Sequence, residues 1–402
     1  MNKRLLKKLR IVTIICLVVL FIELMYILFC AFFREDKSVY FDGVNAFTNI
    51  SDGYVTVGSN NNNDEYYEKA KLTIYNNKKE NVMEKLYNKG YNSAFFGVAV
   101  DEDNNYIVVG NCEVDKNNEK NATREALIVK YDEDGNIIFD KTFSVLDNSK
   151  FTNVIVVEDG YLVVGQSIYK SNKVGDTKAG GAYLIKYSKD GKILWKSNYG
   201  NNNSAIFNDV LVDDDNIYVV GKDNSRLGII CKYDEDGKLL AMNDYKYTDN
   251  LGFSSIVKVD DYLYVCGSNR ISDDNTDAMI VKYNMDIKYI DEVIYDSEGI
   301  GRFNKIIKDE HDNLITIGIV AVVDKKNYNT VDEYDYDGII AKYDKKLDKI
   351  AVVTYGDDRD DYFTDLKLDG NNYLVSGYSS YEDGSFLSKF IKYSDALKVL
   401  EI

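Results

Sequence analysis

Proline and histidine are the residues that this sequence most clearly lacks. Its 402 residues contain no proline and one histidine, His311. A single imidazole argues against Ser/His/Asp hydrolysis, Cys/His proteolysis and histidine-ligated zinc or haem. Neither a G-x-x-x-x-G-K-[ST] phosphate loop nor a dinucleotide fingerprint occurs, so we expect no nucleotide cofactor. Without proline, the turns must depend on glycine, asparagine and aspartate.

The five cysteines form no recognisable framework. Cys112, Cys231 and Cys266 are far apart and odd in number, which fits neither paired disulfides nor a C-x-x-C metal site. Cys16 and Cys30 lie in an apolar run, each after a large apolar residue, whereas a lipidated cysteine follows a small one. We therefore expect no lipid on these two, and we expect buried thiols at Cys231 and Cys266, which lie in apolar strand runs.

Positive charge is scarce beyond the first ten residues. The chain has a net charge of −17, but residues 1–10 carry +5, whereas residues 38–402 carry 42 basic and 63 acidic side chains, or −21. A domain this acidic is repelled by nucleic acid, so we exclude nucleic acid as a partner. The charge would attract cations or basic partners, and it would also keep an exported domain soluble.

The chain has one long hydrophobic run, residues 11–33, interrupted only by Thr13 and Glu23. At ~1.5 Å per residue the run is about 34 Å long, which matches a bilayer core of about 30 Å. It is too long for a cleavable signal peptide. We predict a transmembrane helix over residues 11–33. A basic segment, 1–10, would stay in the cytoplasm, because positive charge marks the inner side of a membrane.

The prediction makes the chain a single-pass protein of the cell membrane. A short linker, residues 34–39, would lead to an extracellular domain over residues 40–402. Glu23 would lie near the bilayer centre, where an ionised carboxyl is costly. It is either a contact with another transmembrane helix or one tolerated polar residue in a very apolar segment.

The rest of the chain repeats with a period near 50 residues. The landmark is a short apolar run that ends in glycine, as in residues 54–58 (YVTVG), 106–110 (YIVVG) and 161–165 (YLVVG). Successive landmark glycines are 52, 55, 56, 46, 51 and 59 residues apart. A fixed period of this size is typical of solenoids and propellers.

Each repeat carries four strand signals. A phenylalanine opens the first strand, and we assign this position to Phe47 and Phe96 in the first two repeats. The landmark run is the second strand, and a third strand usually ends in Lys-Tyr. A turn such as Asp-Gly, a strong hairpin signal, then leads into an amphipathic fourth strand.

Four antiparallel strands per repeat predict one propeller blade per repeat. The second and third strands are apolar at nearly every position, which suits strands covered on both sides by neighbouring blades. The fold class that we predict is all-β, a seven-bladed β-propeller preceded by one transmembrane helix.

Residues 161–165 followed by residues 182–195 (AYLIKYSKDGKILW) resemble bacterial PQQ-like, quinoprotein-type propeller repeats. The resemblance implies the propeller fold over residues 40–402. Those families repeat a tryptophan in the last strand, which occurs here once, at Trp195, and no positions match a quinone-binding site. The resemblance therefore implies the fold but no quinone cofactor. Many such repeats belong to non-catalytic, protein-binding envelope proteins.

The strand order predicts one face of tight turns and one face of variable loops. From landmark glycine to the tyrosine that ends the third strand is 17, 21, 22, 12, 16, 25 and 16 residues. Recognition usually depends on variable loops carried by a rigid scaffold. We therefore assign the working surface to residues 59–69, 111–125, 166–181, 268–277, 319–337 and 378–385. The loop tyrosines that could stack on a ligand are Tyr66, Tyr67, Tyr169, Tyr328, Tyr334, Tyr336, Tyr378 and Tyr381.

One loop resembles the start of a calcium-binding loop. Glu333, Asp335 and Asp337 alternate before Gly338, and calcium loops supply oxygen ligands in this way. The first residue is Glu, however, and a strand follows where the far ligand should be. Calcium is the one metal ion that the sequence suggests, and a solvated acidic loop is the alternative.

Three functions remain open. The first is a non-catalytic recognition or scaffold module that binds a protein or an envelope component through the variable loops. The second is a carboxylate-based carbohydrate-active enzyme, or a glycan-binding protein, on the same fold. A cation-dependent sensor working through Glu23 and the acidic loops is a third. An enzyme would need convergent carboxylates with perturbed pKa values in the central channel.

Overall fold

The structure is a computed structural model. It describes residues 43–60, 68–87, 89–90, 92–114, 123–146, 148–168, 180–200, 205–223, 227–245, 252–272, 275–297, 299–322, 335–356, 359–380 and 386–401. The chain divides into two compact units, and all of these residues belong to the second, residues 40–401. Within this part, no helix has the length and apolar character that crossing a bilayer requires. The predicted span 11–33, with Glu23, and the flanking segments 1–10 and 34–39 lie outside the described residues.

All of the named elements are β-strands, and within each four-stranded sheet consecutive strands pair antiparallel. Five sheets have four strands each. Their strands are β1 Val44–Ile50, β2 Gly53–Asn60, β3 Lys69–Asn76, β4 Asn81–Leu86; β13 Ile206–Asp213, β14 Asn216–Lys222, β15 Gly228–Asp234, β16 Leu239–Tyr245; β17 Gly252–Val259, β18 Tyr262–Ser272, β19 Asn275–Asn284, β20 Tyr289–Tyr295; β21 Gly301–Lys308, β22 Leu314–Val322, β23 Asp335–Tyr343, β24 Lys349–Tyr355; β25 Asp361–Asp369, β26 Asn372–Ser380, β27 Phe386–Tyr393 and β28 Val399–Glu401.

The remaining strands form one eight-stranded sheet. They are β5 Ser93–Val100, β6 Tyr106–Val114, β7 Thr123–Tyr131, β8 Ile137–Phe143, β9 Asn148–Val157, β10 Gly160–Ile168, β11 Gly181–Ser188 and β12 Ile193–Tyr199. A parallel bridge between Arg124 of β7 and Asn148 of β9 joins its two antiparallel halves. The prediction of seven separate blades is therefore wrong: the propeller has five four-stranded blades beside this larger sheet. The two blades join because the N-terminal end of β7 extends far enough to lie beside the first residue of β9.

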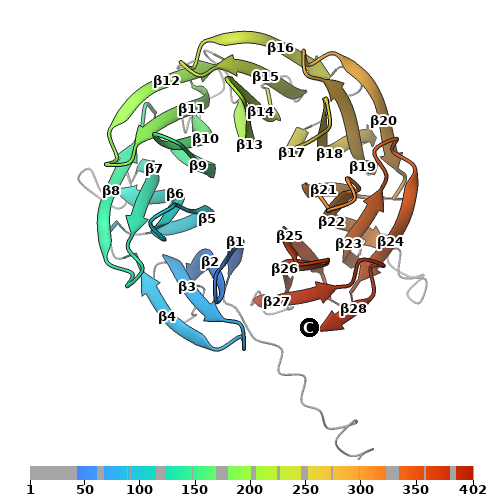
Figure 1. Cartoon of the computed structure of the whole chain (residues 1–402), viewed down its shortest axis with the longest axis horizontal. Coiled ribbons are helices and arrows are strands. Elements are labelled where there is room, and N and C mark those ends of the chain that lie inside the picture. Colours follow the sequence, from blue (N-terminus) through green and yellow to red (C-terminus); the bar gives the residue numbers. More distant parts are fainter. Residues whose placement is uncertain are drawn as a thin grey trace, which may run out of the picture. The chain divides into compact units, whose positions relative to one another are not determined.

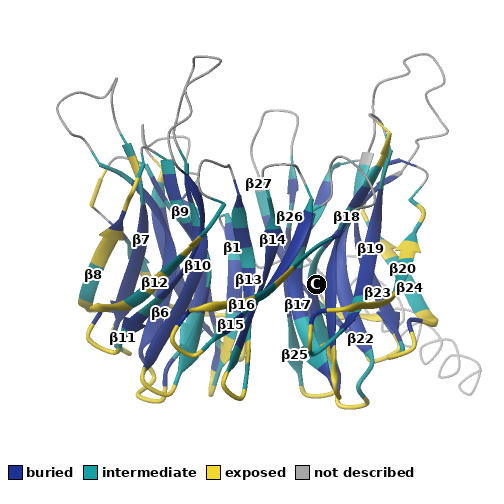
Figure 2. Ribbon diagram, turned by 90° about the horizontal axis from the view of Figure 1, so that it is seen from above, coloured by how far each residue is buried: buried dark blue, intermediate teal, exposed yellow. Residues whose placement is uncertain are grey.

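The sheets surround a central channel (Figure 1). β1, β5, β9, β13, β17, β21 and β25 are the inner strands, and each packs against the next around the ring, including β25 against β1. Apolar side chains fill the space between neighbouring sheets. Val164 and Leu184, for example, share one buried cluster with Phe207 and Val219 of the next sheet. The expectation that second and third strands are buried on both sides is confirmed, since β6 and β11 are buried over most of their length (Figure 2).

A ladder of side-chain hydrogen bonds connects the inner strands. In most of them a bulge follows the opening aromatic residue, and the bulged side chain donates to a backbone carbonyl of the next inner strand. The bonds run from Asn45 to Phe95 (2.8 Å), Thr152 to Phe207 (2.6 Å), Asn208 to Phe253 (2.7 Å), Asn304 to Phe363 (2.9 Å) and Thr364 to Val44 (3.4 Å). The last bond closes the ring.

The ladder corrects the predicted opening residue of the first two repeats. Phe95, and not Phe96, pairs with the landmark Gly110 and is fully buried. In β1 it is Val44 that pairs with Gly58, so Val44 and not Phe47 holds this position. The sequence could not show this, because Phe95 and Phe96 are adjacent in the second repeat and a valine replaces the aromatic residue in the first.

Ring closure also depends on the carboxylate of Asp365 in β25. It accepts the backbone N–H of Phe47 at 3.0 Å and of Leu366 at 2.8 Å, and Lys367 is its ion-pair partner at 3.4 Å. The ring of Phe47 packs edge-on against Phe390, with centroids 4.7 Å apart. First and last blades thus meet through side chains and not through a shared strand.

Tight turns occupy one face of the ring. The Asp-Gly hairpins close with a bond from the glycine N–H to the aspartate carbonyl, as in Gly135 to Asp132 at 3.0 Å. Gly135, Gly191 and Gly237 have φ near +75°, which suits glycine because it has no Cβ. The exposed turns lie together at one end in Figure 2. The face opposite, where inner strands begin and second strands end, is called the loop face below.

Replacing Asp365 by alanine should destabilise the propeller by about 1–3 kcal/mol. The change leaves the buried N–H of Phe47 without its acceptor at the seam of the ring. Urea unfolding of the full-length protein measures the effect. Asp348→Ala, at an exposed turn residue, is the control and should change stability by less than about 0.5 kcal/mol. Equal effects of both variants would contradict the role of Asp365 in closure.

Candidate functional site

Three tyrosines stack on the loop face between the blades β21–β24 and β25–β28. Tyr362 of β25 lies between Tyr336 of β23 and Tyr378 of β26. Its ring centroid is 5.9 Å from that of Tyr336 and 4.9 Å from that of Tyr378, with interplanar angles of 28° and 24°. Tyr362 and Tyr378 are direct cross-strand partners, which explains the closer pair. All three side chains are partly exposed, so the stack is a polar aromatic surface.

Asp360 holds this stack in place. Its carboxylate accepts the backbone N–H of Tyr336 at 3.2 Å and the hydroxyl of Tyr362 at 3.3 Å, while its carbonyl accepts the N–H of Ser380 at 2.9 Å. Burial and the charge of Asp360 raise the pKa of Tyr362, and burial raises the pKa of Tyr378. Both hydroxyls therefore stay protonated at neutral pH, and that of Tyr362 is used as the donor to Asp360.

The neighbouring Asp361 stabilises the fold and does not face the surface. It is buried and accepts hydrogen bonds from Ser379 and from Lys389, the latter at 3.1 Å. This buried pair anchors the start of β25 beneath the stack. The acidic connection that precedes it therefore contributes one carboxylate, Asp360, to the surface and one to the interior.

Of the predicted site residues, the structure brings together Tyr336 and Tyr378. The sequence did not indicate Tyr362, which connects them, because Tyr362 lies in a strand and the candidate tyrosines were those of the variable loops. An aromatic residue directly before the opening phenylalanine, as in Tyr362-Phe363, was the signal available. The other predicted tyrosines lie outside the described residues: Tyr66, Tyr67, Tyr169, Tyr328, Tyr334 and Tyr381.

The predicted calcium ligands can be followed only in part. Glu333 and the side chain of Asp335 lie outside the described part of the structure. The carboxylate of Asp337 lies against Gly356, where a Cβ would be 1.8 Å from its Oδ1. Only glycine fits beside Asp337 in this position. Within the described residues no group of three or more potential metal ligands converges.

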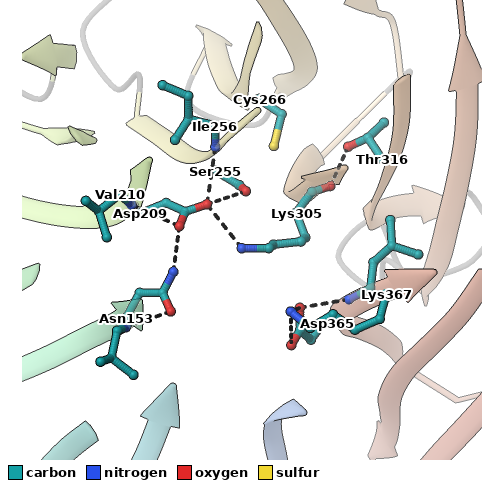
Figure 3. A network of polar contacts seen from close by, with 12 residues as sticks. Asn153, Asp209, Val210, Ser255, Ile256, Cys266, Lys305, Thr316, Asp365 and Lys367 are labelled. Carbon is teal, nitrogen blue, oxygen red and sulfur yellow. Dashed lines mark hydrogen bonds and ion pairs between the residues drawn. The ribbon is translucent and has the colours of Figure 1, made fainter. Parts of the chain in front are cut away.

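The central channel carries a network around Asp209 (Figure 3). Its carboxylate accepts hydrogen bonds from Asn153 at 2.5 Å and Ser255 at 2.5 Å, and forms an ion pair with Lys305 at 3.1 Å. Burial alone would raise the pKa of Asp209, but Lys305 and Ser255 outweigh burial and lower it. Burial would lower the pKa of Lys305, but Asp209 and Asp365 raise it. Both groups are charged and mutually compensated.

A cavity of about 130 Å³ opens on the tight-turn face. It is lined by Asp309, Glu310, His311, Leu368, Gly370, Asn371, Tyr373 and Asp395. At its base the buried Lys342 contacts Asp309 at 3.0 Å and the hydroxyl of Tyr373 at 3.0 Å. Lys130, Asp101 and Tyr161 repeat this arrangement between β5–β8 and β9–β12, with Lys130 2.9 Å from Asp101. The lysine of the Lys-Tyr motif is therefore a recurring link between blades, and the cavity is its surface opening.

No protein-family model matches this chain, and no curated protein is similar to it. Solved structures are similar in fold. The Dos1 propeller aligns with a TM-score of 0.51 and 11% identity, over 88% of this chain and 93% of that one. The β-propeller domain of the Trilobed protease from Pyrococcus furiosus aligns with a TM-score of 0.45 and 11% identity, over 88% and 93%. An α-L-arabinofuranosidase from Clostridium thermocellum gives 0.37 and 11% identity, over 67% and 96%. At these identities the similarity shows the β-propeller fold alone. It does not show that the chain belongs to the PQQ-like family.

The buried carboxylate Asp309 should make stability depend on pH. Burial would raise its pKa, but hydrogen bonds from Asn313 and Lys342 lower it to about 2. A lowered pKa stabilises the fold by about 2 kcal/mol above pH ~4, and this contribution is lost as pH falls toward 2. The stability difference between the wild type and Asp309→Asn should therefore shrink from pH ~5 to pH ~2.

Urea unfolding of both full-length proteins across this pH range is the measurement. Asp348→Asn serves as the control, and its difference from the wild type should stay flat because the residue is exposed. A constant gap for Asp309→Asn at all pH values would show that folding does not lower the pKa of Asp309.

Proposed function

We propose that this chain is a membrane-anchored recognition module whose extracellular propeller binds a protein partner through its loop face. The observation that carries the proposal is the stack of Tyr336, Tyr362 and Tyr378 on that face. Tyrosine is enriched at the energetic centres of protein interfaces, because it combines a large rigid apolar surface with a polar tip. The stack is fixed by Asp360, so little conformational entropy is lost when a partner covers it.

The asymmetry of the ring supports the same assignment. The tight-turn face is built from short hairpins that close on their own backbone bonds. The loop face carries connections whose lengths vary from repeat to repeat, between 12 and 25 residues from glycine to tyrosine. Variation of this kind on a rigid scaffold is the usual basis of recognition.

The membrane anchor in this proposal rests on the amino-acid sequence. Residues 11–33 have the length and composition of a membrane span, and five positive charges precede them. With that orientation the N-terminus is cytoplasmic and the propeller is outside the cell. The partner is then a membrane or envelope protein.

The channel chemistry favours recognition over the carbohydrate-active alternative. Carboxylate-based glycosidases need two carboxyl groups facing the substrate, one of them with a raised pKa. In the described part of the channel, Asp209 and Asp365 each have a lysine partner, and the pKa of Asp209 is lowered. Burial raises the pKa of Asp277, but Asp277 lies on β19, the third strand of its blade, and not on one of the inner strands.

Photo-cross-linking in cells that produce the full-length chain tests the proposal. A photoreactive amino acid replaces Tyr378 on the loop face or, as the control, Tyr289, an exposed tyrosine on the outer strand β20. We expect one recurrent cross-linked protein from position 378 and none from position 289. Tyr378→Ala should weaken recovery of that partner about tenfold or more, as for an interface hot spot, and Tyr289→Ala should not.

The outcome that would contradict the proposal is equally concrete. If neither position yields a protein adduct and the purified chain is retained on wall polysaccharide, the loop face binds glycans and not a protein. Adducts of equal yield from both positions would indicate non-specific contact.

A further inference from the structure

One buried carboxylate of the propeller has no basic partner. Six aspartates are buried among the residues that the structure describes, and five of them lie within 3.4 Å of a lysine ammonium group: Asp101, Asp209, Asp309, Asp361 and Asp365. The sixth, Asp277 of β19, is 7% exposed and forms no ion pair with a described residue. It accepts a long hydrogen bond, 3.4 Å, from the backbone N–H of Ser297. Burying an uncompensated carboxylate costs stability, so this exception points to a missing ligand.

Asp277 lies at the loop-face end of its blade, in a row without positive charge. The residue opposite it in β18 is Asn269. On the other side Ala278 pairs with Tyr295, so the next residue along, Asp296, comes opposite Asp277. Carboxylates directly opposite each other on neighbouring strands repel. Burial raises the pKa of Asp277, and the charge of Asp296 adds to this effect.

The next blade shows what the same positions hold when no second carboxylate is present. Asp337 of β23 corresponds to Asp277, since each lies six residues before the tyrosine that ends its third strand. Gly356 corresponds to Asp296, and the carboxylate of Asp337 fills the space beside it, where a Cβ would be 1.8 Å from Oδ1. Asp296 has a side chain at this position. The blade of Asp277 therefore places two carboxylates where the next blade places one.

An amide oxygen adds a second unmet acceptor. Asn275 begins β19 two residues before Asp277, so both side chains project from the same face of the strand. The Oδ1 atom of Asn275 is buried and has no hydrogen-bond partner. The backbone between them is already bonded, because Thr276 donates to the carbonyl of Gly299 at 2.9 Å and accepts from the hydroxyl of Ser297 at 3.0 Å. The buried groups left short of partners are thus acceptor oxygens.

We propose that these oxygens bind a calcium ion, with Asp277 and Asp296 as carboxylate ligands, Asn275 as an amide ligand and water at the remaining positions. Calcium takes about six to eight oxygen ligands and accepts carboxylates and amides in irregular geometry. The described residues bring no three acidic, histidine or cysteine side chains together, and the site offers oxygen alone, which does not suit zinc. A divalent cation compensates the buried aspartate and removes its repulsion with the second one.

This site differs from the calcium loop that the sequence suggested. That loop, residues 333–337, belongs to the next blade. In the site proposed here, Asp277 lies on β19, whereas Asp296 lies on the segment that connects β20 to β21. A calcium ion would therefore tie this connection to the start of β19 on the loop face. The inference goes beyond the proposed recognition function and does not depend on it, because the ion needs no protein partner.

Calcium titration of the full-length protein in phosphatidylcholine nanodiscs, after removal of metal ions with a chelator, tests the proposal. With calcium chloride as the probe, thermal unfolding should show one saturable site with a dissociation constant of about 0.1–1 mM, as in extracellular calcium modules. Asp277→Asn should weaken this site by about tenfold or more, because it removes the buried charged ligand. Asp348→Asn, at an exposed turn, is the control for binding to the acidic surface and should change nothing.

The same experiment separates ion binding from a merely structural role. Without calcium, Asp277→Asn removes an uncompensated buried charge, so its thermal midpoint should equal or exceed that of the wild type. With calcium well above the dissociation constant, the wild type should gain stability and Asp277→Asn should not. Asp337→Asn, at the equivalent position of the next blade, is the matched control and should respond to calcium as the wild type does.

Three results would overturn the inference. One is a calcium response that Asp277→Asn retains in full. Another is a response that Asp337→Asn loses and Asp277→Asn keeps, which would place the ion in the loop of the next blade. The third is the absence of a saturable response in the wild type, which would mean that a proton neutralises Asp277 instead. Should Asp277→Asn fail to fold, Asp296→Asn changes an exposed residue and carries the same test.

Discussion

The hydrogen bonds from five of the bulge side chains to the next inner strand are the interaction on which the ring depends. Between neighbouring blades, the described residues share the single parallel bridges Arg124–Asn148 and Thr276–Ile300 and no longer backbone ladder. They meet through apolar side chains, which are not directional and fix a distance more than an angle. Asn45, Asn208 and Asn304 add a directional contact at the same point of each inner strand. That contact fixes how the inner strands face the channel.

Three successive layers of the inner strands follow from this arrangement, and each has its own chemistry. The first layer, one residue before the opening aromatic residue, carries Arg302 and Tyr362. The bulge layer holds the ring together. The layer beyond it contains charges that compensate one another, with Asp209 bound by Lys305 and Asp365 bound by Lys367. The two carboxylates of this inner layer therefore each have a cationic partner within the ring.

Much of the fold could be predicted from local patterns. Alternation, the landmark glycines and the Asp-Gly turns depend on neighbouring residues, so the four strands of each repeat and the tight turns were readable in the sequence. The prediction of seven separate blades was wrong because the Arg124–Asn148 bridge depends on how far β7 extends toward β9 in space. Phe96 was the wrong opening residue because its neighbour Phe95 is equally aromatic and only the register distinguishes them. Phe47 was wrong because the first repeat has a valine, Val44, at this position.

The candidate site divides in the same way. The sequence by itself determined that the working surface is the face of variable connections, and it named Tyr336 and Tyr378, because loop length and residue type are local properties. Only the tertiary structure decided that these two rings stack on Tyr362, since the three residues come from different strands and meet through sheet pairing and ring closure. It alone also decided that Lys305 of β21 is paired with Asp209 of β13. Whether a charge is paired depends on which strands lie side by side. In a ring closed by long-range contacts, the sequence of a single repeat does not determine which strands are neighbours.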